Sequence, residues 1–188
     1  MNTLLDLLTR RQSTPSKLLS EPGPDPAQLD ALLRMAMRVP DHGNMTPFRI
    51  LGIRGDHRLR LSARLAEVSA ARGDDPAKVE KDRNRFNHAP LILAVIAHVT
   101  PGHKVPEQEQ LLSAGLVAYN LLLGAESLGF GAQWLTGWSA YDRGIAEWLR
   151  LAAHERVVAW VHIGTRSGSA PDRPRPEPSS KYSEWQST

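Results

Sequence analysis

Residues 91–98 read LILAVIAH, an apolar run closed by a histidine, with Pro90 before it and Pro101 shortly after it. The run has the length of a strand, and an apolar stretch without polar alternation is typical of a strand buried on both faces. We therefore expect residues 91–98 to form the buried central strand of a sheet.

On either side of this run the sequence predicts a mixture of helices and strands. Asp25-Pro26-Ala27-Gln28 predicts a helix start, with Asp25 as N-cap and Gln28 at the reciprocal capping position. A short first helix is expected from the apolar stripe of Leu4, Leu5, Leu7 and Leu8. Further helices are expected over 59–71, 74–87, 107–128 and 144–151, and further strands over 48–53, 131–135 and 157–164. These elements do not alternate regularly, so we expect an α+β fold with a central sheet flanked by helices.

The chain has 188 residues, with 23 Lys and Arg against 20 Asp and Glu, and thus a formal charge of +3. This length is typical of one domain with a full core. We expect residues 1–170 to form that domain. Residues 171–188 contain closely spaced prolines at 171, 174, 176 and 178 and are expected to form an extended tail rich in Pro and Arg.

Composition excludes several classes of protein. The chain has no cysteine, which rules out disulfide scaffolds, thiolate metal centres and cysteine nucleophiles. Its longest apolar run is far shorter than the roughly 20 residues that cross a bilayer, and its N-terminus has the reverse of a secretory signal's order. The small, scattered charge argues against nucleic-acid binding. We expect a cytoplasmic protein with neither nucleic acid nor membrane among its partners.

Familiar catalytic motifs are missing from the sequence. There is no P-loop, no His-Glu-x-x-His pair and no Gly-x-Ser-x-Gly elbow. Gly129-Phe130-Gly131 follows a predicted helix and precedes a predicted strand, the wrong order for a dinucleotide fingerprint, so we interpret Gly129 as a helix C-cap and Gly131 as a tight turn. No histidine has another three or four residues away, and no metal site is predicted.

Three polar segments remain that composition alone does not explain. The first is Arg10-Arg11-Gln12-Ser13, at the end of the predicted N-terminal helix. Arginine forks beside a serine hydroxyl suit a phosphate group, because they offer charge-assisted donors and a short O–H donor. The alternative is a solvated helix C-terminus, where basic side chains are favoured in any case.

The second segment is the loop 38–48, which reads RVPDHGNMTPF and is held by two prolines. Its donors could face a flat heteroaromatic edge, or Asp41 or Asn44 could cap the backbone of a polar turn. The third segment is 133–138, QWLTGW, where a predicted strand ends in a glycine-containing loop. Trp134 and Trp138 are interpreted there as core or interface residues.

In this order and separation, the three segments resemble the nitroreductase family of FMN-dependent flavoproteins, and in particular a small bacterial subgroup of it. Arg11-Gln12-Ser13 matches the family's Arg-x-Ser phosphate motif. Arg38-Val39-Pro40-Asp41-His42 matches the subgroup's Arg-Ala-Pro-Asp-His loop. The segment 133–137 and the closing strand that ends at residues 164–165 extend the match over roughly residues 3–170.

The resemblance implies a nitroreductase-like fold with a mixed, mainly antiparallel sheet, and a homodimer with FMN sites between its subunits. It implies hydride transfer from NAD(P)H through FMN to a nitroaromatic, quinone or similar small acceptor in a ping-pong sequence, with no catalytic side chain. The cofactor-binding residues that it implies are Arg10, Arg11, Gln12, Ser13, Arg38, His42, Asn44, Trp134, Leu135, Thr136, Gly137 and Arg166. Arg166 is included only for its position after the last strand.

The sequence departs from the subgroup at the cofactor edge. Leu135-Thr136-Gly137 stands where the subgroup often has Arg-Ser-Gly, so one cationic contact to the cofactor is missing. Gln12 stands where a second arginine is common, with Arg10 nearby to compensate. Two other functions stay open: an FMN-binding relative with a different redox reaction or a non-catalytic role, and a non-enzymatic helical dimerisation module.

Overall fold

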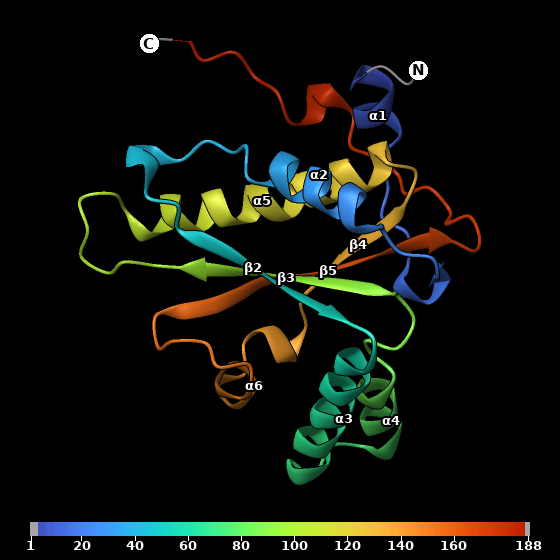
Figure 1. Ribbon diagram of the computed structural model, residues 1–188. Coiled ribbons are helices and arrows are strands. Elements are labelled where there is room, and N and C mark those ends of the chain that lie inside the picture. Colours follow the sequence, from blue (N-terminus) through green and yellow to red (C-terminus); the bar gives the residue numbers. More distant parts are fainter. Residues whose placement is uncertain (1–3, 187–188) are drawn as a thin grey trace.

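The computed structural model describes residues 4–186 (Figure 1). Its strands are β1 (Leu19–Ser20), β2 (Phe48–Arg54), β3 (Leu91–His98), β4 (Gly131–Leu135) and β5 (Glu155–Arg166). Its α-helices are α1 (Leu4–Arg10), α2 (Pro26–Ala36), α3 (Asp56–Ala71), α4 (Pro76–Arg83), α5 (Glu107–Ser127) and α6 (Arg143–Trp148). Short 3₁₀ turns are η1 (Ser16–Leu18), η2 (His42–Asn44), η3 (Trp138–Ala140) and η4 (Pro178–Ser180). Both η1 and β1 lie in a range for which the sequence predicted no helix or strand.

The strands form one sheet in which β5 is the common partner. The strands β2, β3 and β5 lie in that order, and β4 and β1 also pair with β5. Every strand pairing among the described residues is antiparallel. The segment 91–98 therefore lies between two neighbours and is buried apart from His98, which confirms the predicted central strand.

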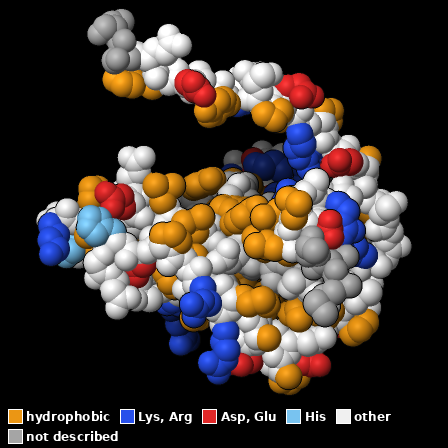
Figure 2. All heavy atoms as spheres, turned by 90° about the horizontal axis from the view of Figure 1, so that it is seen from above, with side chains coloured by type: hydrophobic (Ala, Val, Ile, Leu, Met, Phe, Trp, Pro, Cys, Tyr) orange, Lys and Arg blue, Asp and Glu red, His pale blue; other side chains and the backbone are white. Residues whose placement is uncertain are grey.

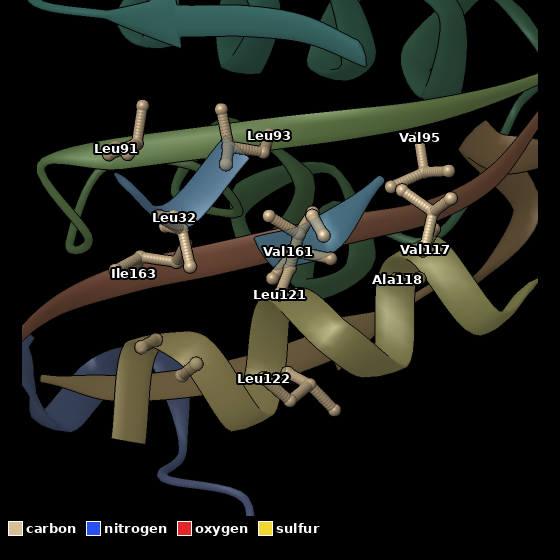
Figure 3. Packing of buried hydrophobic residues seen from close by; sticks show 14 of the residues in the cluster. Leu32, Leu91, Leu93, Val95, Val117, Ala118, Leu121, Leu122, Val161 and Ile163 are labelled. Atoms are coloured by element: carbon tan, nitrogen blue, oxygen red, sulfur yellow. The ribbon is translucent and has the colours of Figure 1, made fainter. Parts of the chain in front are cut away.

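Helices cover both faces of this sheet (Figure 1). Successive side chains of a strand point to opposite faces. Along β3, Leu91, Leu93 and Val95 face α2 and α5, whereas the residues between them face α3 and α6. Figure 3 shows Leu32 of α2 and Leu121 of α5 in the first of these two cores. Because both faces are covered, no position of β3 favours a polar residue, which explains the continuous apolar run.

Local signals in the sequence fix where two of the helices begin or end. The side chain of Asp25 accepts a hydrogen bond from the backbone N–H of Gln28, and the side chain of Gln28 accepts one from the backbone N–H of Asp25. The predicted capping box of α2 is thus confirmed. After α5, Gly129 has a φ of +86°, as the predicted C-cap requires. Gly131 is not a tight turn, since it is the first residue of β4.

An apolar face lies outside the two cores. α1 buries none of its residues, and Leu4 and Leu5 are 68% and 74% exposed. The other large exposed hydrophobic residues on or beside α1, α2 and α5 are Leu8, Met35, Met37, Leu112, Leu116 and Tyr119. Figure 2, which views the molecule from the side of α2 and α5, shows hydrophobic side chains gathered over this face.

The chain continues past β5 as a tail. Residues 171–186 are exposed throughout and contain one short element, η4. Figure 1 shows this tail rising beside α1 and then running away from the sheet. Its outermost described aromatic residue, Trp185, is 87% exposed.

Candidate functional site

A polar cavity of about 170 Å³ lies where the chain leaves α1. Arg11, Gln12 and Ser13 line it from one side, and Pro171, Arg173 and Arg175 of the tail line it from the other. No carboxylate is among its lining residues, and three of them are arginines. The first predicted segment and the tail therefore meet at one basic cavity.

The lining of this cavity suits a phosphate group. Guanidinium groups and a hydroxyl offer the charge-assisted and short donors that phosphate oxygens accept. In addition, Oε1 of Gln12 is buried and has no hydrogen-bond partner among residues 4–186. Buried acceptors are normally satisfied, so this atom indicates room for a ligand hydroxyl. The residues present therefore fit a phosphorylated ligand that also carries hydroxyl groups, as FMN does.

A larger pocket of about 490 Å³ begins only two residues further along the chain. Its lining residues are Pro15, Ser16, Lys17, Lys81, Asn84, Arg85, His88, Gln133 and Leu135. Ser13 lines the first cavity and Pro15 lines the second, so their Cα atoms are at most about 7 Å apart. The two hollows are therefore close enough for one phosphorylated ring compound to occupy both.

The segment that borders both hollows is fixed against β4. The backbone N–H of Thr14 donates to the carbonyl of Ala132 at 2.9 Å, and the N–H of Ser16 donates to Oε1 of Gln133 at 2.6 Å. Strand alternation then points Gln133 and Leu135 toward the larger pocket and Trp134 toward the other face.

Trp134 accordingly packs against α5. Its ring lies 3.9 Å from the position that a Cβ of Gly115 would take, and it contacts the core cluster that contains Leu121. This confirms the interpretation of Trp134 as a core residue. Its side chain therefore points away from the larger pocket, and only the backbone of Trp134 lies beside Leu135, which lines that pocket.

Three arginines predicted from the sequence, Arg10, Arg38 and Arg166, lie outside both linings. Arg166 pairs with Glu126, and its Nε donates to Oγ1 of Thr14 at 3.3 Å, so Arg166 braces the segment that leads from the cavity. The Nε of Arg10 donates to the backbone carbonyl of Asp6 at 3.3 Å. Arg173 and Arg175 line the cavity instead. The sequence signalled them only as basic residues of a proline-rich tail.

The loop 38–44 runs along α5, from Asn120, whose Nδ2 donates to the carbonyl of Arg38 at 3.1 Å, to Glu109 near the helix start. Nδ1 of His42 lies 2.6 Å from Oε2 of Glu109, whereas Arg166, beside the cavity, pairs with Glu126. Glu109 and Glu126 are separated by about 25 Å, at a rise of 1.5 Å per helical residue. Figure 1 shows α1 and the loop before β2 near opposite ends of α5. The His42 end of the loop therefore lies far from the cavity of its own chain.

The loop itself is held by its own aspartate. The Asp41 carboxylate accepts hydrogen bonds from the backbone N–H groups of Met45 and Thr46, at 3.1 and 2.7 Å. The backbone-capping interpretation is thus confirmed for Asp41. The side chains of Arg38, His42 and Asn44 are exposed, and they are the donors that this loop presents outward.

The loop 135–137 lies next to Arg85, which was not predicted from the sequence as a site residue. A Cβ on Gly137 would lie 3.1 Å from Nη1 of Arg85. Arg85 is held by Asp82, which is fully buried. A helix was expected over 74–87, whereas the structure forms α4 only over Pro76–Arg83, with Asp82 buried. No short-range sequence signal links Asp82 to the loop after β4.

Residues 4–186 contain no metal centre of clustered side chains and no membrane-spanning helix. No group of three or more His, Cys, Asp or Glu side chains there could hold a metal ion. In the same part of the chain, no helix combines the length and the apolar character that crossing a membrane requires.

Comparison with known sequences identifies the family. A family model described as "Nitroreductase family" matches residues 8–165. The chain is 34% identical over 181 residues to "Putative NAD(P)H nitroreductase YdjA" of Escherichia coli (strain K12), a match that covers 95% of this chain and 98% of that protein. It is 35% identical over 164 residues to "Putative NAD(P)H nitroreductase" of Haemophilus influenzae, covering 86% and 87% of the two chains.

Solved structures share the fold. A nitroreductase-like family protein from Bacillus cereus superposes with a TM-score of 0.83 at 21% identity, covering 100% of this chain and 98% of that one. "A putative nitroreductase in complex with fmn" from Desulfovibrio desulfuricans superposes with a TM-score of 0.74 at 21% identity, covering 99% and 98%. The predicted fold class and the family resemblance are both confirmed. The chain belongs to the nitroreductase family of oxidoreductases.

Proposed function

We propose that this protein is an FMN-dependent oxidoreductase that takes electrons from NAD(P)H and delivers them to a nitroaromatic, a quinone or a similar small acceptor. The observation that carries the proposal is the basic cavity of Arg11, Ser13, Arg173 and Arg175 beside a pocket large enough for a ring. The relatives named as NAD(P)H nitroreductases support the donor, and the neighbour solved with FMN supports the cofactor. A cytoplasmic location is part of the proposal.

The residues of this chain would bind and orient the cofactor. Arg11 and Ser13, together with Arg173 and Arg175, would hold the phosphate, and Oε1 of Gln12 would accept from a hydroxyl of the linking chain. The backbone of 135–137 would border the ring. When bound, FMN would supply the redox chemistry of two-electron transfer from NAD(P)H to a small acceptor. The apolar walls formed by Pro15 and Leu135 would keep water from the ring.

We further propose that a second copy of the chain completes the site. His42, which pairs with Glu109, lies about 25 Å along α5 from the cavity of its own chain, so another copy would bring this donor to the cavity, with Asn44 and Arg38 of the same loop. The exposed apolar face on α1, α2 and α5 supports such an association, since exposed apolar surface of this kind typically marks an interface. In a two-fold dimer each patch would meet its counterpart.

A visible absorption spectrum of freshly purified protein tests the cofactor. We expect the absorbance of oxidised flavin, FMN in the supernatant after denaturation, and parallel double-reciprocal plots when NAD(P)H is varied at several concentrations of a nitroaromatic or a quinone. A colourless protein that takes up no added FMN would contradict the proposal. Bound FMN without NAD(P)H oxidation would favour the alternative of another redox reaction or a non-catalytic flavin-binding role.

Mixing two inactive variants tests whether the site is shared. If Arg11 and His42 come from different copies, a heterodimer of Arg11→Ala and His42→Ala has one doubly defective site and one intact site. Random exchange would then restore FMN binding to about a quarter of all sites. Sites contained within single chains would show no recovery after mixing, and that result would refute the shared site.

A further inference from the structure

The loop after β4 carries no basic side chain at Leu135, Thr136 or Gly137. We propose that Arg85 supplies the missing cation to the cofactor ring, and that Asp82 and Trp138 are positioning residues that hold Arg85 in place. This inference rests on the proposed function. Arg85 belongs to another part of the chain, between α4 and β3, and no residue predicted from the sequence takes this role.

Asp82 holds two partners with its two oxygens. Its Oδ1 accepts from Nε and Nη2 of Arg85 at 3.0 and 2.6 Å, and its Oδ2 accepts from Nε1 of Trp138 at 2.9 Å. The Asp82 side chain is fully buried, and that of Arg85 is 19% exposed. Charge-assisted hydrogen bonds in such a setting fix geometry strongly. The guanidinium of Arg85 is therefore held in one orientation before any ligand binds.

The remaining nitrogen of Arg85 faces the candidate site. Nη1 has no hydrogen-bond partner among residues 4–186, while it lies 3.1 Å from the position of a Cβ on Gly137. Arg85 also lines the 490 Å³ pocket together with Leu135. Gly137 leaves this approach open because it has no side chain. The free N–H groups of Arg85 are thus directed at the loop that lacks its own cation.

Trp138 is itself held from a second side. The guanidinium of Arg72 lies 4.5 Å from the centre of the Trp138 ring and pairs with Asp142, the N-cap of α6. The Trp138 indole therefore lies between two residues: Arg72, the C-cap of α3, and Asp82 of α4. This network joins the α3–α4 hairpin to the loop after β4, and Arg85 is its member at the pocket.

A fixed cation at this place would favour the reduced cofactor. Reduced flavin tends to carry negative charge at the N1–C2=O edge, and charge near that edge tunes its electronics. A donor held in advance stabilises such charge without reorganisation. The other basic residues that line the pocket are Lys17, Lys81 and His88, and no carboxylate lines it. Arg85 differs from these three because Asp82 fixes it.

The test is the variant Arg85→Gln, with FMN binding and redox potential as readouts. We expect the ratio of affinities for reduced and oxidised FMN to fall about tenfold, which lowers the two-electron potential by about 30 mV. The matched control is Arg83→Gln, at the end of α4, where an exposed side chain pairs with Glu80. This control should leave both the affinities and the potential unchanged.

Asp82→Asn separates positioning from simple charge. If only net charge mattered, removing the Asp82 carboxylate would raise the potential. If Asp82 positions Arg85, the potential should fall as in Arg85→Gln. Trp138→Phe removes one donor to Asp82 and keeps a ring under Arg72, so a fall is expected there as well. If the Asp82 or Arg85 variants do not fold, the potential of Trp138→Phe decides whether Asp82 and Trp138 position Arg85.

The outcomes distinguish this inference from the function that it deepens. An Arg85→Gln protein that binds FMN with an unchanged potential would overturn the inference and leave the proposed function intact. A rise in potential on Asp82→Asn would overturn the positioning role. Wild-type protein that binds no FMN would refute the proposed function, and this inference with it.

Discussion

Gly131 lies directly against Leu19: a Cβ added to Gly131 would lie 2.7 Å from Cδ2 of Leu19. The same atom would lie 2.8 Å from Cγ of Arg166 and 3.0 Å from Oγ1 of Thr14. Gly131 is therefore the point at which three segments meet: β1, the end of β5 and the segment that leads from the basic cavity. Their close approach requires a residue without a side chain.

Gly131→Ala should lower the free energy of unfolding by about 2 kcal/mol, because overpacking at a closed contact displaces its neighbours. FMN affinity should fall as well, since Thr14 is one of those neighbours. Denaturant unfolding and FMN titration measure the two effects. Gly115→Ala is the matched control: its Cβ would meet only Trp134, at 3.9 Å. Alanine favours a helix interior, so equal or higher stability is expected there. A Gly131→Ala protein as stable as the wild type would contradict the close contact.

Arg11→Ala should weaken FMN binding, because Arg11 lines the basic cavity. The loss of one charge-assisted hydrogen bond, at about 1.5–3 kcal/mol, corresponds to roughly a 10- to 100-fold weaker affinity. Thermal unfolding of the cofactor-free protein should hardly change. The neighbouring Arg10→Ala removes an equal charge outside the cavity lining and should have a much smaller effect. Equal affinities of both variants for FMN would remove Arg11 from the site.

Glu155→Gln should reduce stability at neutral pH by about 2 kcal/mol. Nε and Nη2 of Arg49 donate to the Glu155 carboxylate at 2.5 and 2.9 Å. Mainly through these bonds, the pKa of Glu155 is lowered from 4.5 to about 2. A lowered carboxyl pKa stabilises the folded state above pH 4.5, and this stabilisation is lost as the pH falls toward 2. Unfolding free energies measured across that range should therefore converge for the two proteins. A difference that stays constant down to pH 2 would contradict this prediction.

His162→Phe should flatten the pH dependence of stability in a different range. Burial, and then the charges of Arg85, His88 and Arg58, lower the pKa of His162 from 6.5 to about 3. Between these values the unfolded chain binds the extra proton, so stability falls on acidification by up to about 1.4 kcal/mol per pH unit. Neither ring nitrogen of His162 has a partner among the described residues, so phenylalanine forfeits no hydrogen bond. The exposed His57→Phe serves as control. Equal slopes below pH 6.5 in both variants would refute the assignment.

Features governed by near neighbours in the chain could be predicted from the sequence. The capping box of Asp25 and Gln28, the C-cap at Gly129 and the apolar strand 91–98 each follow from a short stretch of residues. The order of the α-helices and of the longer strands was predicted for the same reason, whereas the two-residue strand β1 was not. Hydrophobic periodicity and helix caps depend on residues a few positions apart. Tertiary packing does not override these local signals in this fold.

Contacts between distant segments could not be predicted in this way. Arg166 was assigned to the phosphate by its position after the last strand, yet it pairs with Glu126, forty residues away. Trp138 and Asp82 are 56 residues apart, and nothing near either of them signals the other. Gly131 was interpreted as a turn because two glycines flank Phe130, whereas close packing against Leu19 requires it. Long-range packing, which a single sequence does not display, decides all three.

The length of α5 has a consequence for how the protein is handled. If a second copy of the chain completes the site, as proposed, a single chain carries only part of the FMN-binding residues, because α5 separates His42 from the basic cavity. Loading and self-association are then linked by mass action. Dilution should release the flavin and bleach the solution, and added FMN should draw chains together. The yellow colour of the preparation would serve as a gauge of its concentration.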